Sequence, residues 1–528
     1  MNFNLINDAW IPVVRQDGSN DKIMPWQITE RDNPVMEINA PRPDFQGALY
    51  QFMIGLLQTC FAPEDEDEWL ESWEETPTPE ALQEAFEKVA EAFELFNPDG
   101  AAFMQDLNFP DGESKRISAL LIEAPGTKTI KDNLDHFIKR GQANGFCSSC
   151  VATALFSLQL NAPSGGQGHR VGLRGGGPLT TLMMPSESDE SLWRKLWLNV
   201  LNDEEIKSTS NILNCSVLPW MGKTRVSDNK QSITTPESVH PLQMYWGMPR
   251  RIRLHKPDNQ GVCDICGQGS SPLFDGYETK NFGTNYEGAW VHPLTPYRFD
   301  PKKEKPPLSL KGQQGGLGYR HWLGLVLQEP ESGDKAATMV RFINDERSHL
   351  VFKGQLGSLW CFGFDMDNMK ARCWYDSHFP IFNLNDRQRE NLIDWAGELI
   401  RSAREVTKML RSAVKSAWFR RTEDVKGDMS MIDAQFWQAT ETDFYLLLDK
   451  LAKLPGDTRM ASPEIYDAWF KVLQKHVFQV FEYATMSSNP EDLNLRRIVL
   501  ANQNLKKKFY GNKHIKTLRA KAVKEVVA

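Results

Sequence analysis

Hydrophobic and polar positions change pattern near residue 382. Before that point, short apolar runs predict strands over residues 4–14 and 117–123. Helices are predicted over residues 45–61 and 80–96, and the first is apolar on most faces, which indicates burial. Gly- and Pro-rich connections separate these elements. We therefore expect a mixed α/β domain over residues 1–382.

Long helices are predicted after residue 382. From about residue 386 to 419, apolar residues recur at three- and four-residue steps and form one stripe: Leu392, Trp395, Leu399, Ala403, Val406, Leu410, Ala413 and Ala417. Further helices are expected over 432–454, from Ser462-Pro463-Glu464 onward, and from about residue 490. Short connections predict antiparallel neighbours, so residues 383–528 are expected to form an all-α four-helix bundle and the whole chain an α+β protein.

Charge is distributed unevenly along the 528 residues. The chain has 61 Lys and Arg against 69 Asp and Glu, yet residues 494–528 hold ten Lys or Arg and a single acid. Overall acidity argues against indiscriminate coating of nucleic acid, whereas a locally basic end permits a confined contact. No apolar run is long enough to cross a membrane, and the N-terminus lacks the basic flank of a signal peptide. We therefore expect a cytoplasmic protein.

Two CxxC pairs, Cys147/Cys150 and Cys263/Cys266, are candidate metal ligands. Four thiolates satisfy a tetrahedral Zn²⁺ and leave no open position for water, so this zinc would be structural. A folded domain can bring distant pairs together, because loop-closure entropy grows only logarithmically with length. A redox CxxC and two unrelated pairs are the alternatives.

Residues 163–178 read PSGGQGHRVGLRGGGP and contain seven glycines, together with Arg170 and Arg174. The stretch has neither the Gly-Lys-Ser/Thr of a phosphate-binding P-loop nor a dinucleotide fingerprint. Glycines let a backbone approach a ligand closely, and arginines supply charge for phosphates. A flexible hairpin with a structural turn is the alternative.

Two groups of cations are candidate phosphate contacts. The first lies at alternating three- and four-residue spacing on one face of the helix predicted over 386–419, where acids are sparse: Arg401, Arg404, Lys408, Arg411 and Lys415. The alternative is a solvated face. The second, Lys302, Lys303 and Lys305, lies in the predicted loop PKKEKPP, and such a run is usually only solvated.

The sequence lacks the signatures of metalloproteases, serine hydrolases and kinases. Asp365 and Asp367 form a carboxylate pair that a metal-dependent nuclease could use, although companion acids or histidines at helical spacing are missing. We therefore expect a non-catalytic binding subunit. A nuclease centred on this pair and a zinc-stabilised scaffold that contacts only protein are the alternatives.

These residues resemble the CasA family, the large subunits of the type I-E CRISPR surveillance complex Cascade. The segments NLINDAWIPV, FCSSC, GLRGGGPLTT, CDICGQ and GFDMDNMKARCWY match in order along essentially the whole chain. The resemblance implies an α/β domain with a zinc site followed by a four-helix bundle. It also implies recognition of the protospacer-adjacent motif (PAM) in double-stranded DNA, local unwinding, and recruitment of a helicase-nuclease.

The resemblance also implies roles for particular residues. The family loop that enters the PAM minor groove matches Gly165, Gly166, Gln167 and Gly168, and the lysine finger of the family falls on Asn281 with Lys280 adjacent. The wedge that separates the first base pair falls on Asn368, between Asp367 and Met369. The segment that anchors the subunit near the guide RNA matches Phe137, Ile138 and Lys139. Lys302, Lys303 and Lys305 coincide with a lysine patch that guides DNA.

Overall fold

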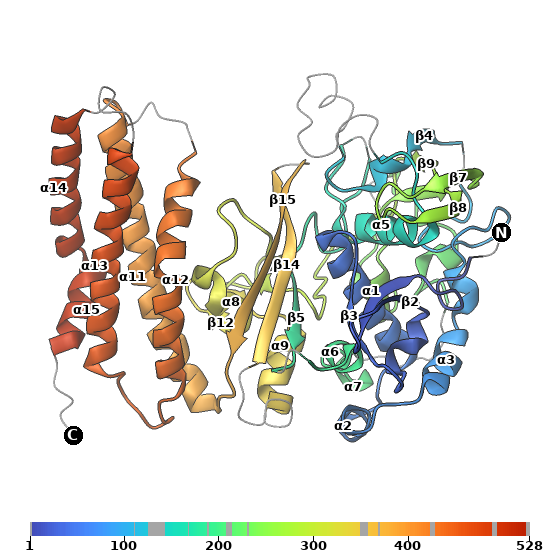
Figure 1. Ribbon diagram of the computed structural model, residues 1–528, viewed down its shortest axis with the longest axis horizontal. Helices are drawn as coiled ribbons and strands as arrows, with labels where there is room; N and C mark the ends of the chain where they lie inside the picture. Colours follow the sequence, from blue (N-terminus) through green and yellow to red (C-terminus); the bar gives the residue numbers. More distant parts are fainter. Residues whose placement is uncertain are drawn as a thin grey trace. The chain divides into compact units, whose positions relative to one another are not determined.

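The computed structural model describes residues 3–109, 111–124, 143–166, 168–186, 189–206, 214–229, 232–348, 357–367, 370–422, 428–487 and 494–523. The chain divides into two compact units (Figure 1). Unit 1 comprises Met1–Gly312, Ala337–Val340 and Gly357–Asp376, and unit 2 comprises Gln313–Ala336, Arg341–Leu356 and Ser377–Ala528. Unit 2 therefore includes two segments that precede the expected boundary at residues 382 and 383.

Small antiparallel sheets form the β structure of unit 1. β1 (Ile11–Arg15) lies between β2 (Asn20–Ile23) and β3 (Val35–Ile38), and β9 (Gly276–Lys280) lies between β4 (Glu113–Arg116) and β6 (Arg251–Leu254). β14 (Gly357–Asp367) lies between β5 (Thr180–Met184) and β15 (Lys370–Ile381), while β7 (Asn259–Val262) pairs with β8 (Gly269–Leu273). These short sheets bring segments far apart in the sequence side by side.

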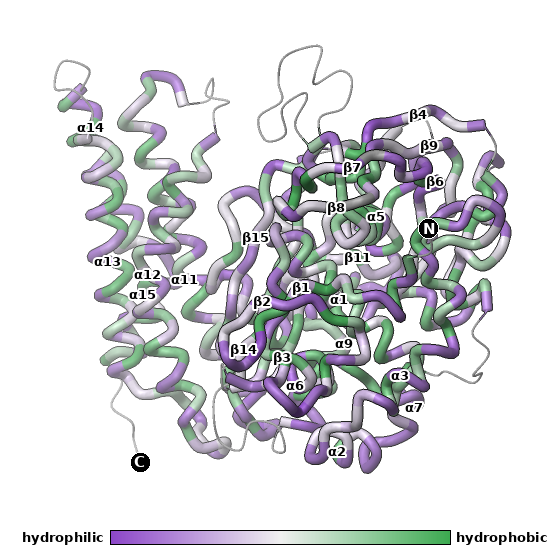
Figure 2. Tube along the Cα trace, turned by 45° about the vertical axis from the view of Figure 1, so that its right-hand side comes forward, coloured by the Kyte–Doolittle hydropathy of each residue, from purple (hydrophilic) through white to green (hydrophobic). Residues whose placement is uncertain are grey.

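Two buried helices, α1 (Pro43–Cys60) and α5 (Ser148–Asn161), pack together in the core of unit 1. Figure 2 shows hydrophobic stretches along both helices. Phe52 of α1 meets Trp10, Phe156 and Trp246 edge to face, with ring centroids 5.1–5.9 Å apart. Aromatic contacts on several sides of one helix explain why its sequence is apolar on most faces.

Shorter helices surround this core: α2 (Glu66–Glu74), α3 (Pro79–Glu87), α6 (Leu192–Trp197) and α7 (Asp203–Ile206). The helix expected over 80–96 is shorter than predicted, because α3 ends at Glu87 and a separate 3₁₀ turn covers Ala90–Phe93.

Both strands expected near the start of the chain need correction. Residues 4–8 form a turn and β1 begins only at Ile11, because the Asn4 side chain accepts hydrogen bonds from the backbone N–H groups of Ile6 and Asn7. The strand expected over 117–123 is wrong. Ile117–Leu120 forms a 3₁₀ turn instead, which buries Ile117 and Leu120 on one side at three-residue spacing.

Helices dominate unit 2: α11 (Asp386–Trp418), α12 (Ser430–Ala452), α13 (Pro463–Met486), α14 (Leu495–Gly511) and α15 (Lys513–Val523). The predicted stripe of α11 is buried, and α11 packs against α12, α13 and α14. This confirms the C-terminal helical bundle.

The fourth predicted helix is broken into α14 and α15, and the Asn512 side chain accepts a hydrogen bond from the His514 N–H at the break. Before the bundle, unit 2 also contains α8 (Trp322–Val326) and the short strands β12 (Gln328–Glu329) and β13 (Asp334–Lys335). Among the described residues, none of the helices is long and apolar enough to span a membrane.

Candidate metal centre and nucleic-acid interface

The two CxxC pairs converge on one point in unit 1. The sulfur atoms of Cys147, Cys150, Cys263 and Cys266 all lie within 4.8 Å of one another. Three of these residues are buried, Cys266 is partly buried, and none forms a disulfide. This convergence contradicts the alternative of two unrelated pairs. It gives the four-thiol set that a tetrahedral soft metal ion requires.

Local backbone geometry explains how the pairs meet. Cys147 is the N-cap of α5 and Cys150 lies in its first turn, whereas Cys263 and Cys266 lie in the turn between β7 and β8. That turn closes when the Gly267 N–H donates to the Cys263 carbonyl, and Gly267 takes a positive φ of 73°. Among the described residues between the two pairs are α5, β5, α6 and β6, so the cysteines do not form a local zinc ribbon.

Asp264 ties the hairpin turn to the start of α5. Its carboxylate accepts hydrogen bonds from the N–H groups of Asn144 and Gly145, at 2.6 and 3.0 Å, and its own N–H donates to the Gly145 carbonyl. Hydrogen bonding with Cys147 and Cys263, reinforced by burial, raises the pKa of the Cys150 thiol. A bound cation would reverse this shift, because it stabilises the thiolates that bind it. The residues present thus fit a structural metal ion.

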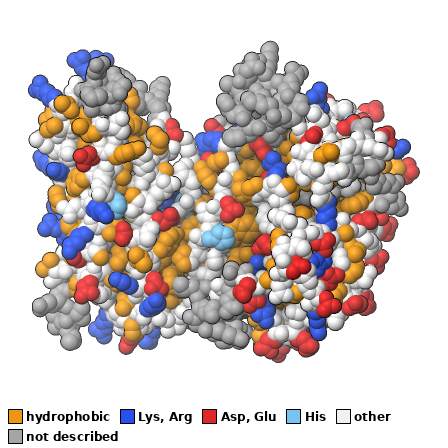
Figure 3. All heavy atoms as spheres, in the orientation of Figure 1, with side chains coloured by type: hydrophobic (Ala, Val, Ile, Leu, Met, Phe, Trp, Pro, Cys, Tyr) orange, Lys and Arg blue, Asp and Glu red, His pale blue; other side chains and the backbone are white. Residues whose placement is uncertain are grey.

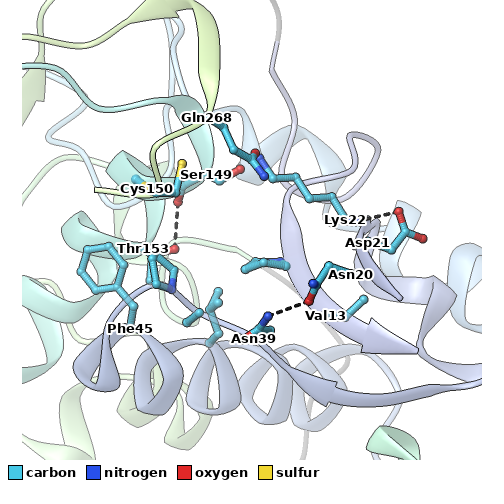
Figure 4. Close-up of a pocket in the computed structure, with 15 residues that line it drawn as sticks. Val13, Asn20, Asp21, Lys22, Asn39, Phe45, Ser149, Cys150, Thr153 and Gln268 are labelled. Carbon is cyan, nitrogen blue, oxygen red and sulfur yellow. Dashed lines mark hydrogen bonds between the residues drawn. The ribbon is translucent and has the colours of Figure 1, made fainter. Parts of the chain in front are cut away.

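A cavity of about 480 Å³ lies beside the cysteine cluster (Figure 4). Cys150 and Cys266 form part of its wall, together with residues of α1, α5 and the β1–β2 hairpin. On the wall away from the cysteines, the Asn39 amide donates a hydrogen bond to the Asn20 side-chain oxygen at 2.8 Å. Apart from the two cysteines, the lining contains none of the site residues predicted from the sequence.

The glycine loop and the predicted finger segment lie together, although more than 100 residues separate them. The Phe282 N–H donates to the Gly168 carbonyl at 2.8 Å. Within the loop, the His169 N–H donates to the Gly166 carbonyl, and both Gly166 and Gly168 have positive φ angles. The structure therefore places Gly165, Gly166 and Gly168 next to the segment that contains Lys280 and Asn281. Gln167 lies outside the described residues.

Lys280 is exposed, and its ammonium group donates to the Asp111 carbonyl at 2.8 Å, while Asn281 is half-buried. The Arg250 guanidinium lies directly behind the loop. A Cβ at Gly165 would be 2.9 Å from Nη1 of Arg250, and Nε of Arg250 has no hydrogen-bond partner among the described residues. Burial lowers the pKa of Arg250 to about 10. The loop therefore has a cation behind it that the sequence did not suggest.

The second part of the glycine stretch is packed inside the protein. A Cβ at Gly176 would lie 2.8 Å from Cα of Pro163, and a Cβ at Gly177 would lie 2.8 Å from Cγ of Met366. Gly177 thereby touches β14 close to its tip. These glycines permit close backbone packing, as the structural-turn alternative expected for the stretch as a whole.

Neither arginine of the stretch offers a free guanidinium to a phosphate, which corrects the sequence interpretation. Arg174 is buried and donates to Gln51 Oε1, Thr180 Oγ1 and Thr295 Oγ1, at 2.6 to 3.1 Å. Burial lowers its pKa to about 10. Arg170 donates from Nε and Nη2 to Ser227, both at 2.7 Å. Both arginines hold the fold together.

The hairpin of β14 and β15 carries the predicted wedge segment at its tip. Asn368 and Met369 lie outside the described residues, and Asp367 is exposed directly before them. Asp365 is buried and accepts hydrogen bonds from Arg372 at 2.7 and 3.2 Å and from the Tyr375 hydroxyl at 3.3 Å. Asp365 is thus committed to a structural ion pair. Among the described residues, Asp365 and Asp367 belong to no group of three or more potential metal ligands.

Lys302, Lys303 and Lys305 are exposed in a loop, as expected. The loop turns on Asp300, whose carboxylate and carbonyl accept hydrogen bonds from the N–H groups of Lys302 and Lys303. The guide-anchoring segment, Phe137, Ile138 and Lys139, lies outside the described residues.

The basic stripe on α11 is paired with acids, so the premise that acids are sparse there is wrong. Arg401 pairs with Glu331 at 3.0 Å, Arg404 with the buried Glu329 at 3.0 Å, Lys408 with Glu405 at 2.8 Å and Arg411 with Asp433 at 3.1 Å. Glu331, Glu329 and Asp433 come from other elements, which a helical pattern cannot reveal. Figure 3 likewise shows blue and red side chains interspersed over the helical unit.

Fold and site together define a two-unit α+β protein with a four-cysteine centre. The family model for the CRISPR-associated protein Cse1 matches residues 4–480. The chain therefore belongs to the Cse1 family.

Solved structures show the same fold along both chains. CasA (Cse1) of Thermus thermophilus is 18% identical, with a TM-score of 0.67 over 98% of this chain and 99% of that one. Cse1 of Thermobifida fusca is 15% identical, with a TM-score of 0.68 over 99% of each chain. A chain from a structure described as a CRISPR RNA-guided surveillance complex is 15% identical, with a TM-score of 0.65 over 96% of this chain and 99% of that one. At such identities the likeness is one of fold.

Proposed function

We propose that this chain is the large, non-catalytic subunit of a type I-E CRISPR surveillance complex and that it recognises the PAM in double-stranded DNA. Membership of the Cse1 family supports the assignment. The observation that carries the site is the hydrogen bond between the Phe282 N–H and the Gly168 carbonyl. It joins two segments that are far apart in the sequence and that the family resemblance both assigns to the PAM.

The glycine loop suits a narrow groove. Gly166 has no atom within 4 Å of the position of a Cβ, so its backbone stands clear of the rest of the protein. A backbone without side chains can approach the edges of bases, and the minor groove distinguishes mainly A·T from G·C pairs. Gly165, Gly166, Gln167 and Gly168 would enter the groove, with Lys280 or Asn281 beside them. Such a reader tolerates several related PAM sequences.

Strand separation is assigned to the tip of the β14–β15 hairpin. Asn368 would occupy the place of a displaced base, since its amide can both donate and accept hydrogen bonds. Met369 would fill the unstacked space, and Asp367 would flank them. Insertion of such a wedge costs a few kcal/mol of unstacking, which contacts to the opened duplex offset. The paired Asp365 would stiffen the hairpin, and its ion pair with Arg372 speaks against the nuclease alternative.

Cations outside the groove would contact the DNA backbone. Lys302, Lys303 and Lys305 are exposed and suit this role. Of the α11 stripe, Arg401, Lys408 and Arg411 would exchange weak surface ion pairs for phosphates, because exposed ion pairs contribute only about 0–1 kcal/mol. Lys415 would contact phosphate on the same face. Arg404 is the exception, since its partner Glu329 is buried. We therefore assign Arg404 a structural role.

The four cysteines would hold Zn²⁺, which stabilises the start of α5 and so the glycine stretch that follows it. Phe137, Ile138 and Lys139 would anchor the subunit to the guide RNA and the other subunits. Formation of the R-loop would then permit recruitment of the helicase-nuclease. In RNA-guided complexes, base pairing between the guide RNA and the target strand reads the sequence, while the protein reads only a short element of the duplex.

The test uses the assembled complex and two duplexes, one fully paired and one already unpaired beside the PAM. Asn368→Ala should weaken binding to the paired duplex by about 1–3 kcal/mol, the scale of one base contact, and leave the pre-opened duplex unaffected. Gly168→Val should weaken both, because groove entry precedes opening. Gly511→Ala, in open space on α14, is the control. Equal losses on both duplexes for Asn368→Ala would refute the wedge assignment.

A further inference from the structure

Phe282 has an unusual combination of backbone strain and exposure. Its φ is +63°, in the left-handed region that bulky side chains rarely adopt, and 40% of its surface is exposed. An aromatic ring held at the surface by a strained backbone needs a cause in the surrounding structure.

Neighbouring contacts impose this conformation. The backbone of the next residue, Gly283, is pressed against Pro249, since a Cβ at Gly283 would lie 2.0 Å from the Pro249 carbonyl oxygen. Ser227 holds both residues: its N–H donates to the Phe282 carbonyl at 3.1 Å, and its hydroxyl donates to the Gly283 carbonyl at 2.5 Å. Arg170 in turn clamps Ser227. The chain thus pins Phe282 from both sides.

The ring of Phe282 lies against the glycine loop. A Cβ at Gly168 would be 2.7 Å from Cδ1 and Cε1 of the ring, so this position has room only for glycine. The exposed Lys280 lies two residues before Phe282 in the chain, and Arg250 lies behind Gly165 of the same loop. An exposed aromatic ring among cations is the usual composition of a surface that contacts nucleic acid.

We propose that Phe282 is a DNA-contacting residue whose ring packs on deoxyribose in the wall of the minor groove, beside the glycine loop. This inference rests on the proposed function and adds a contact that family and sequence did not suggest. Sugars carry no base identity, and the ring carries no charge. The contact would therefore add affinity without changing PAM preference or the salt dependence of binding.

Strain provides the test. Glycine and asparagine both accept a positive φ, so Phe282→Gly and Phe282→Asn remove the ring and keep the backbone conformation. In the assembled complex, both should bind PAM-containing duplex about tenfold more weakly than wild type. The PAM preference and the salt dependence of binding should stay as in wild type. The unfolding midpoint should stay the same or rise. Phe282→Tyr should bind as wild type does.

Asn33→Gly is the matched control, since Asn33 also has a positive φ, is half-buried and lies outside the residues proposed to contact DNA. It should leave DNA binding unchanged. Wild-type affinity in both Phe282→Gly and Phe282→Asn would overturn the inference, and so would a loss of affinity that merely follows a lowered unfolding midpoint. A wild-type complex without PAM preference would instead refute the proposed function, and a tenfold loss in Phe282→Gly would still support a DNA contact by the ring.

Discussion

The two parts of the glycine stretch are both rich in glycine, yet their surroundings differ. In residues 165–168, Gly166 stands in open space, whereas in residues 172–178 a Cβ at Gly176 or Gly177 would press into other parts of the chain. Arg170 ties the first part to a neighbouring loop, and Arg174 is buried beneath the second. Glycine therefore serves exposure at Gly166 and close packing at Gly176 and Gly177, while Gly165 and Gly168 in the first part also pack closely, against His169 and Phe282. The predictions below separate these two uses.

The largest effect is expected from the cysteine centre, which supports both parts. α5 runs from the cysteines to Asn161, directly before the stretch. Cys263→Ser should lower the free energy of unfolding by several kcal/mol, because the binding energy of a structural metal ion is folding energy. Urea unfolding and metal analysis check this. Cys215→Ser, at an exposed cysteine outside the cluster, is the control. Well-folded wild type with far less than one metal ion per chain would contradict the prediction.

Arg174→Met should destabilise the protein by about 2–4 kcal/mol, since three buried oxygen atoms each lose a hydrogen bond from the guanidinium. Arg170→Met is the matched change in the first part. It should cost only about 1 kcal/mol, because Arg170 is partly exposed and loses a single partner residue. Thermal unfolding of both variants measures the difference. Equal losses would mean that the two parts are packed alike.

Gly166→Ala and Gly177→Ala form a matched pair, because both glycines have φ near +60°. Each substitution carries the left-handed penalty of about 1–2 kcal/mol. Only Gly177→Ala adds a collision, with Met366 and with the Phe364 carbonyl oxygen. We expect it to be more destabilising than Gly166→Ala by a further 1–3 kcal/mol or so. Denaturation midpoints that coincide would remove the distinction between the parts.

The smallest effect concerns pH and His169, in the exposed part. Burial, together with the charge of Arg250, lowers the pKa of His169 below its usual 6.5. Below pH 6.5 the unfolded chain therefore binds the proton more readily than the folded one, so stability should fall as pH decreases from 6.5. His169→Gln should show a shallower decline between pH 6.5 and 5. A decline identical to wild type would show that His169 does not contribute.

Much of the fold could be predicted from local patterns. The stripe from Leu392 to Ala417 predicted α11, and the apolar run at 45–61 predicted a buried helix, because helical burial repeats every three to four residues. The strand expected over 117–123 failed since a short apolar run fits a buried turn as well as a strand. The Asn4 turn was missed, although asparagine is a turn former.

The candidate site was predictable only in part. Cysteine spacing indicated the candidate metal ligands, because two CxxC pairs are typical of zinc sites. The ion pairs of the basic stripe on α11 were not foreseen, since three of the acidic partners, Glu331, Glu329 and Asp433, lie outside that helix. The sequence around Phe282 did not distinguish it from a core residue. Its positive φ and its exposure arise from contacts with Pro249, Ser227 and Gly168.

By itself, then, the sequence determined the helices of the C-terminal bundle, the two CxxC pairs of the candidate metal centre and the presence of a glycine stretch, because each is recognised from local spacing in the chain. Only the tertiary structure decided which glycines are exposed, which arginines are buried, and which cations are already paired. Burial and ion pairing join segments that are more than 50 residues apart, such as Arg174 with Gln51 and Arg404 with Glu329. Local pattern carries no information about such distant partners.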